Sequence, residues 1–216
     1  PTEEPDLLGD YAFNNDTHLI NNRSEQHRKD MPNAYAAMDV LYSQGYRLNS
    51  DILELKNLPM DMNIGKNYAA KVIALNNLSE FNDEFFFKYT MDSRGRIYAR
   101  SLIVQPQGAF LNFYEAKPLG DFGLQALMIH YANCSGHDKI SFIERIAWAR
   151  NAGLKKASAM YHCDGNWLEI ENHIEDSKHA YEEYAAAMEY YRATNCNNPK
   201  SYKSALVTHQ DATNSG

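Results

Sequence analysis

Apolar residues recur along this chain mostly at helical spacing. Between Pro32 and Leu55 they follow a helical period that breaks at Gly45 and starts again at Asn49, which predicts a pair of short helices. The same spacing predicts further helices over residues 67–78 and 121–133. We therefore expect a chain in which helix dominates.

The second half of the chain adds two more expected helices. Ser141 and Glu144 have the spacing of a capping box, so a helix should begin there. A long helix should run from Asn166 to Arg192, with a break near Asp176. Its stripe of tyrosine, alanine and methionine is more typical of a core or an interface than of a base-stacking platform. The stripe consists of Tyr181, Tyr184, Ala185, Met188 and Tyr191.

Two stretches have strand character. Residues 85–106 carry aromatic and β-branched residues on both sides of a polar, glycine-containing centre, which predicts a strand, a turn and a second strand. A short strand over 204–208 would place Asp211 just beyond its end. Many helices with a few hairpin-like strands predict an α+β fold that is mainly helical. We divide the chain into a polar N-terminal arm (1–31), a helical N-terminal region (32–83) and a core (84–216).

The composition describes a globular chain with a negative charge. Of its 216 residues 44% are hydrophobic, and 21 basic residues against 28 acidic ones give a net charge of −7. Since affinity for nucleic acid comes mainly from cations that neutralise phosphates, any DNA or RNA contact must be local or shared with a more basic partner. No run of about eighteen apolar residues appears, so we expect no membrane insertion. The three widely spaced cysteines suit reduced thiols in a cytoplasm.

The turn of the expected hairpin, Asp92-Ser93-Arg94-Gly95-Arg96, is the first candidate site. Two arginines flank a glycine, so their forked guanidinium groups can approach a phosphate backbone closely. The alternative is an ordinary hairpin turn whose arginines are solvated or paired with nearby acids. The pentapeptide alone leaves both interpretations open.

Lys139 is the second candidate, because it lies just ahead of the capped helix. Its ammonium and the N–H groups at the start of that helix can together hold a polyphosphate. The alternative is an ordinary exposed lysine beside Asp138.

His130, Cys134 and His137 stand four and three residues apart and have side chains that can bind zinc. A zinc site would need a fourth ligand, and no C-x-x-C pair accompanies the three. Gly136 also interrupts the helix that would bring them together. We therefore do not expect metal at this cluster.

Asp211 is the third candidate, since it follows the expected strand and precedes small residues. Its carboxylate and the next backbone carbonyl are hard oxygen ligands that suit Mg²⁺. Two-metal phosphoryl transfer needs a second carboxylate, and no Asp or Glu follows Asp211 in this sequence. Taken alone, Asp211 also fits a turn or a helix cap.

The three candidates together resemble the phage and mitochondrial single-subunit RNA polymerases. FKYTMDSRGRIYARS is similar to the family's D-x-x-G-R segment, and IHYANCSGHDKISFIERI is similar to its long block around Asp-Lys. The final DATNSG resembles motif A of the palm, where an aspartate precedes small residues ending in Ser-Gly. MPNAYAAMDVLYSQGYRLNSDILEL weakly resembles the family's Asn-Ala-containing helix pair, so the similarity runs from about Pro32 to the end.

The resemblance implies a role for each candidate. Asp211 would bind the two catalytic Mg²⁺ ions with the carbonyl of Ala212 as a further ligand, and Lys139 would contact the triphosphate of the incoming nucleotide. Arg96, with Asp92 and Arg94 organising the turn, would hold the template strand or the RNA–DNA hybrid. The resemblance therefore implies the N-terminal and first palm portions of a right-hand polymerase fold.

The sequence departs from the family pattern in motif A and lacks later motifs. His209 and Gln210 precede the aspartate where many members have an apolar or aromatic residue, and Ala212 replaces the usual glycine. The fingers helix and the second palm aspartate are absent. We therefore expect this chain to be inactive alone. It is either one subunit of a split polymerase, completed by a second chain that supplies these groups, or the observed part of a longer chain, and we favour the split.

Three functions are compatible with these patterns. The first is a subunit of a DNA-directed RNA polymerase that acts on a DNA template with rNTPs and Mg²⁺ to give RNA. The second is a noncatalytic nucleic-acid-binding or assembly module that keeps the D-x-x-G-R turn for phosphate contact. The third is a related DNA polymerase, because motif A chemistry is shared.

Overall fold

The computed structural model describes residues 29, 32–59, 72, 84–91, 97–100, 104–106, 108–174 and 179–208. Its helices are α2 (Pro32–Tyr42), α3 (Ser50–Leu53), α5 (Gly120–Cys134), α6 (Phe142–Trp148), α7 (Leu154–Tyr161), α8 (Trp167–Ile170) and α9 (Ala180–Asn195). Its strands are β1 (Tyr46–Leu48), β2 (Tyr89–Met91), β3 (Ile97–Ala99), β4 (Leu111–Pro118) and β5 (Lys203–Leu206). This mixture confirms the mainly helical α+β class.

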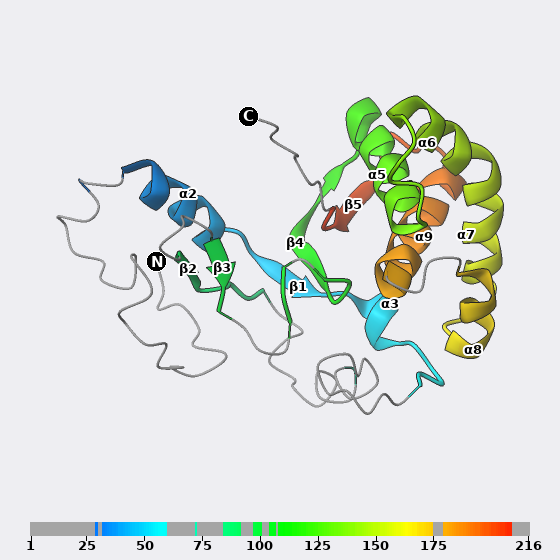
Figure 1. The fold of residues 1–216 in the computed structure, drawn as a ribbon, viewed down its shortest axis with the longest axis horizontal. Helices are drawn as coiled ribbons and strands as arrows, with labels where there is room; N and C mark the ends of the chain where they lie inside the picture. Colours follow the sequence, from blue (N-terminus) through cyan, green and yellow to red (C-terminus); the bar gives the residue numbers. More distant parts are fainter. Residues whose placement is uncertain are drawn as a thin grey trace.

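The strands form two small antiparallel sheets. The first has the order β1-β4-β5, with Tyr46 opposite Phe113 and Lys117 opposite Ser204. The second is the β2–β3 hairpin, in which Tyr89 pairs with Ala99. Figure 1 shows the helices α5, α6, α7 and α9 gathered on one side of the longer sheet, with α2 and the hairpin on the other side of the molecule.

The helices pack around α9, which contacts both α5 and α7. Alanines at 185, 186, 187 and 193 leave little bulk on α9, so its neighbours approach closely and all four are buried. Tyr131 of α5 and Tyr190 of α9 are almost fully buried, and their ring centroids lie 5.8 Å apart. The apolar core therefore sits between α5, α7 and α9.

Helices α6 and α7 continue into each other through a π-helical turn at Ala149–Gly153. The hydroxyl of Tyr131 donates to the carbonyl of Gly153 at 3.1 Å, which ties this turn to α5. A π turn inserts one extra residue into a helix, and such turns occur frequently at functional sites. Here the turn lies directly after the helix that begins at Ser141.

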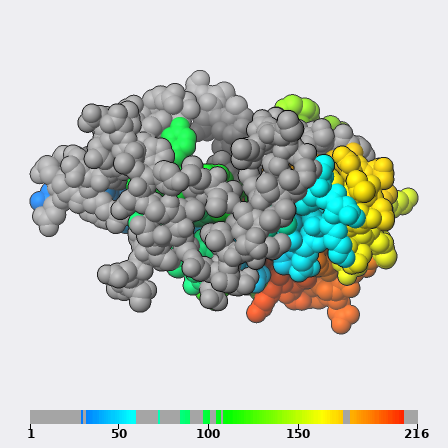
Figure 2. Space-filling model, turned by 90° about the horizontal axis from the view of Figure 1, so that it is seen from below, coloured from blue at the N-terminus to red at the C-terminus, as the bar shows by residue number. Residues whose placement is uncertain are grey.

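The segment after α3 is joined to the start of α8. The backbone N–H of Lys56 donates to Gly165, and the carbonyl of Lys56 accepts from Trp167, at 2.8 and 2.9 Å. Figure 2 shows this contact as the cyan segment against the yellow helical one. A bidentate pair between Arg192 and Asp51 holds α3 to α9 nearby. These bonds connect the N-terminal elements to the helical core.

Most expected elements are confirmed, with shifted ends. The helix pair corresponds to α2 and α3, the helix over 121–133 to α5, and the strand over 204–208 to β5, which begins one residue earlier and ends at Leu206. The long helix is broken as expected: α8 and a 3-10 turn end at His173, and α9 begins at Ala180. Its stripe is core at Tyr184, Ala185 and Met188, which are buried.

Two expected segments fall on residues outside the described part of the chain, and two strands of the structure were not expected. The helix over 67–78 lies outside them except at Val72, and so does the arm 1–31 except at Lys29. Strands β1 and β4 were not expected from the sequence. The division into three regions stays a prediction. Within the described part of the chain, no helix is long and apolar enough to cross a membrane.

Candidate functional site

Of the three candidate clusters, the structure describes the one around Lys139. Asp92, Arg94 and Arg96 belong to residues 92–96, which follow β2 and precede β3 in the sequence and lie outside the described residues. Asp211 and Ala212 follow β5 and also lie outside them. The flanking strands β2, β3 and β5 are present where the sequence predicted strands. How the three clusters approach one another stays a prediction.

The loop between α5 and α6, residues 135–141, begins with a helix stop. The N–H of His137 donates to the carbonyl of Ala132 at 2.9 Å, and the N–H of Gly136 donates to Asn133 at 3.1 Å. With Gly136 at φ 83°, these two bonds form a Schellman motif, which requires a left-handed residue at this position. The loop therefore leaves α5 in a fixed direction.

The loop ends with the expected capping box. The hydroxyl of Ser141 accepts from the N–H of Glu144 at 3.3 Å, and the Glu144 carboxylate accepts from the N–H of Ser141 at 2.9 Å. Hydrogen bonds from the hydroxyl and the N–H of Ser141 hold the pKa of Glu144 below its usual value. Because this carboxylate already occupies the start of α6, Lys139 must bind an anion mainly through its own charge.

Arg145 of α6 binds the loop on both sides of Lys139. Its Nε donates to the carbonyl of Ile140 at 2.9 Å, and Nη2 donates to the carbonyl of Asp138 at 2.5 Å. Its Nη1 donates to Oδ1 of Asn133, near the end of α5, at 2.8 Å. One guanidinium group thus ties the loop backbone to α5 and to α6.

Lys139 itself projects into solvent from this fixed loop. Its side chain is 88% exposed, and Nζ lies 2.7 Å from Oδ2 of Asp138. The hydrogen bond from Lys139 holds the pKa of Asp138 below its usual value. Both members of this pair are exposed and screened by solvent, so the ammonium can exchange Asp138 for another anion.

A buried ion pair supports the loop from the core side. Glu183 of α9 is fully buried; it accepts from the hydroxyl of Ser135 at 2.8 Å and lies 2.6 Å from Nζ of Lys156. His137 stacks on Trp148 with ring centroids 4.4 Å apart. The first half of the loop is therefore anchored to α6, α7 and α9.

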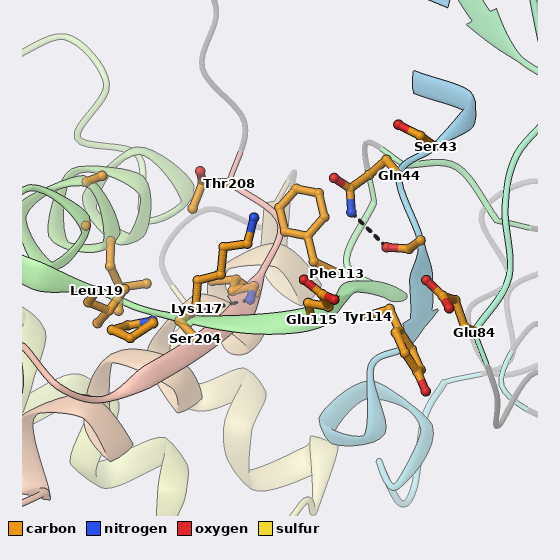
Figure 3. A pocket seen from close by; sticks show the side chains of 16 residues that line it. Ser43, Gln44, Glu84, Phe113, Tyr114, Glu115, Lys117, Leu119, Ser204 and Thr208 are labelled. Carbon is orange, nitrogen blue, oxygen red and sulfur yellow. Dashed lines mark hydrogen bonds between the residues drawn. The ribbon is translucent and has the colours of Figure 1, made fainter. Parts of the chain in front are cut away.

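A cavity of about 560 Å³ lies on the β1-β4-β5 sheet and reaches Thr208, three residues before Asp211. Figure 3 shows Lys117 and Thr208 at one end and Gln44 with Glu84 at the other. Its charged side chains are of both signs, so it has no evident preference for phosphate.

The comparisons with known proteins all indicate one family. A family model described as DNA-dependent RNA polymerase matches residues 117–216. The DNA-directed RNA polymerase of Pseudomonas phage phiKMV is 33% identical over 136 residues, which are 61% of this chain and 16% of that protein. The mitochondrial DNA-directed RNA polymerase of Neurospora crassa is 33% identical over 140 residues, which are 61% of this chain and 9% of that protein.

A shorter match has a higher sequence identity. T7 RNA polymerase of Escherichia phage T7 is 47% identical over 66 residues, which are 28% of this chain and 7% of that protein. Residues 117–216 match the DNA-dependent RNA polymerase family, and the relatives named here are phage and mitochondrial members of it. The resemblance seen in its motifs is confirmed at this level. The chain spans only 16%, 9% and 7% of the three relatives named here.

The three residues considered for zinc do not form a cluster in the described part of the chain. The sulfur of Cys134 lies 3.7 Å from Nε2 of His130 within α5, whereas His137 turns to Trp148. Among the described residues, no group of three His, Cys, Asp or Glu side chains converges as a metal site would require. All three cysteines are free thiols.

The residues that hold the Lys139 loop were not predicted from the sequence. Arg145 was part of the polymerase-like block, but its bonds to Asp138 and Ile140 are tertiary contacts that no local pattern displays. Glu183 lies on α9 beside the apolar stripe, and a charged residue among buried neighbours is itself a signal.

Proposed function

We propose that this chain is the part of a DNA-directed RNA polymerase that supplies the triphosphate-binding lysine, Lys139. Arg145 bonds the backbone on both sides of this residue, and the ammonium stays exposed. That combination of a fixed backbone and a solvent-facing cation is the observation that carries the proposal. A lysine on such a backbone meets the phosphates as a point charge, and the loop loses little backbone freedom on binding.

The remaining assignments rest on the family motifs. Asp211 and the carbonyl of Ala212 offer the hard oxygen ligands that suit Mg²⁺, and Arg96 in the turn with Asp92 and Arg94 offers forked donors for a nucleic-acid backbone. In the proposed reaction a 3′-hydroxyl oxygen bonds to the α-phosphorus of an rNTP as the bond to pyrophosphate breaks. Bound Mg²⁺ would supply charge stabilisation at both oxygens.

The groups that this chain lacks must come from polymerase sequence outside these 216 residues. The second subunit that the sequence suggested finds no support among the relatives, which are single chains. A fingers element and a second carboxylate are required whichever chain carries them. The cytoplasmic location also stays a prediction.

The test is steady-state RNA synthesis by the complete polymerase on single-stranded DNA with rNTPs and Mg²⁺. Lys139→Ala removes a charge-assisted bond, so kcat/KM for rNTP should fall about tenfold to hundredfold. Lys155→Ala, at an exposed lysine on α7, is the matched control and should leave kcat/KM unchanged. An unchanged kcat/KM in Lys139→Ala would refute the triphosphate role.

Asp211→Asn separates the polymerase from a noncatalytic module. Loss of a metal-binding carboxylate should abolish synthesis, whereas a binding module would keep its full function. Comparing rNTPs with dNTPs in the same assay then separates an RNA polymerase from a related DNA polymerase.

A further inference from the structure

All three guanidinium nitrogens of Arg145 donate hydrogen bonds, to the loop that carries Lys139 and to α5. Two of its nitrogens donate to backbone carbonyls of Asp138 and Ile140, and the third donates to Asn133. The guanidinium carbon also lies 5.1 Å from the ring centroid of Phe142. No carboxylate takes part in these bonds, so the arginine acts here as a backbone clamp and not as an ion-pair partner.

The two ends of the loop are fixed by other means. The Schellman motif orders the chain as far as His137, and the capping box orders it from Ser141 onward. Asp138, Lys139 and Ile140 lie between these two ordered ends. Arg145 donates hydrogen bonds to the carbonyls of Asp138 and Ile140. The direction in which the Lys139 side chain leaves the backbone therefore depends on this one guanidinium group.

We propose that Arg145 is a positioning residue for Lys139, which sets the place of the ammonium without contacting the nucleotide. The inference rests on the triphosphate role of Lys139 proposed above. Arginine suits the task because its planar fork donates in several fixed directions at once. A lysine at 145 keeps the charge, but its single nitrogen cannot reach carbonyls on both sides of residue 139 and the Asn133 amide in that planar arrangement.

The experiment is a double-mutant cycle in the complete polymerase, with KM for ATP and kcat measured separately during RNA synthesis. Arg145→Lys should raise KM by about threefold to tenfold, the effect of losing one or two net hydrogen bonds. In the Lys139→Ala background the same substitution should change KM by less than about twofold, because its target is gone. Coupling of this kind is not expected from a merely structural arginine.

Arg150→Lys is the matched control, since Arg150 is an exposed arginine in the π-helical turn that follows α6. It should leave KM unchanged in both backgrounds. Thermal unfolding of every variant accompanies the kinetics. An Arg145→Lys effect on KM of equal size in both backgrounds would overturn the inference, and so would an unchanged KM.

Asn133→Ala provides a second route if Arg145→Lys does not fold. It removes one acceptor of the guanidinium and leaves both carbonyl bonds in place, so KM should rise by about twofold to threefold. That rise should also vanish in the Lys139→Ala background, and a rise that persists there refutes the clamp. A Lys139→Ala enzyme with normal KM would instead refute the triphosphate role itself, so the two failures are distinguishable.

Discussion

Gly153 closes the π-helical turn at a place where an added methyl group has no room. An ideal Cβ built on Gly153 would lie 2.9 Å from Cζ3 of Trp148 and 3.2 Å from Cε1 of Tyr131. Both atoms belong to rigid rings whose centroids are 5.1 Å apart, and Tyr131 is fully buried. Neither ring can move away without disturbing the core between α5 and α9.

Gly153→Ala should therefore destabilise the protein although alanine is the better helix former. Overpacking a core costs about 1–3 kcal/mol, and the gain in helix propensity is at most about 1 kcal/mol. With that gain subtracted, the net loss in free energy of unfolding should reach up to about 2 kcal/mol, which lowers Tm by up to about 8 °C for a chain of this size.

The assay is equilibrium unfolding in urea, with Gly123→Ala of α5 as the control. A Cβ at Gly123 would meet only the side chain of Leu119, at 3.3 Å, and that side chain can rotate. The control should be as stable as the unmodified protein or slightly more stable. If Gly153→Ala equals the control, the packing of the two rings against the π turn is not as tight as argued.

Three further predictions concern buried charges and thiols. Glu183→Gln removes an anionic partner of Lys156 and should cost about 3–5 kcal/mol in urea unfolding, most of it recovered when Lys156→Met is added. Burial raises the pKa of Glu182, so its ionised form weakens the fold: Glu182→Gln should be more stable at pH 7, and the difference should shrink as the pH falls through the raised pKa, as thermal melts at several pH values will show. Burial also raises the pKa of the Cys134 thiol, so iodoacetamide should modify half-buried Cys196 first and reach Cys134 only on unfolding, measured by peptide mass spectrometry.

Local signals in the sequence predicted the elements that depend on local bonds. The helix start at Ser141 was predicted from its spacing to Glu144, and the structure contains both bonds of that capping box. The break before α9 and the β2–β3 hairpin were predicted for similar reasons, because turns and caps are encoded within a few residues. Such signals do not depend on tertiary contacts with the rest of the chain.

Strands β1 and β4 were missed because their stabilisation is nonlocal. Tyr46 pairs with Phe113, far along the chain, and β1 has only three residues, too few to display an alternating pattern. The bonds of Arg145 were missed for the same reason, since they depend on how α5 and α6 fold back on each other. The sequence predicted Lys139 as a phosphate-binding residue, but it could not predict the Arg145 hydrogen bonds that fix the backbone around it.

The acidity of the chain is consistent with a triphosphate site because the site depends on local placement. With a net charge of −7, the long-range field opposes phosphate, so a binding cation must gain its advantage at short range. Leaving Asp138 costs Lys139 little because the pair is exposed and screened by solvent, whereas a charge-assisted bond to a phosphate contributes about 1.5–3 kcal/mol. The exchange favours the phosphate only if little entropy is lost on binding, and a loop fixed at both ends and clamped between them by Arg145 meets that condition.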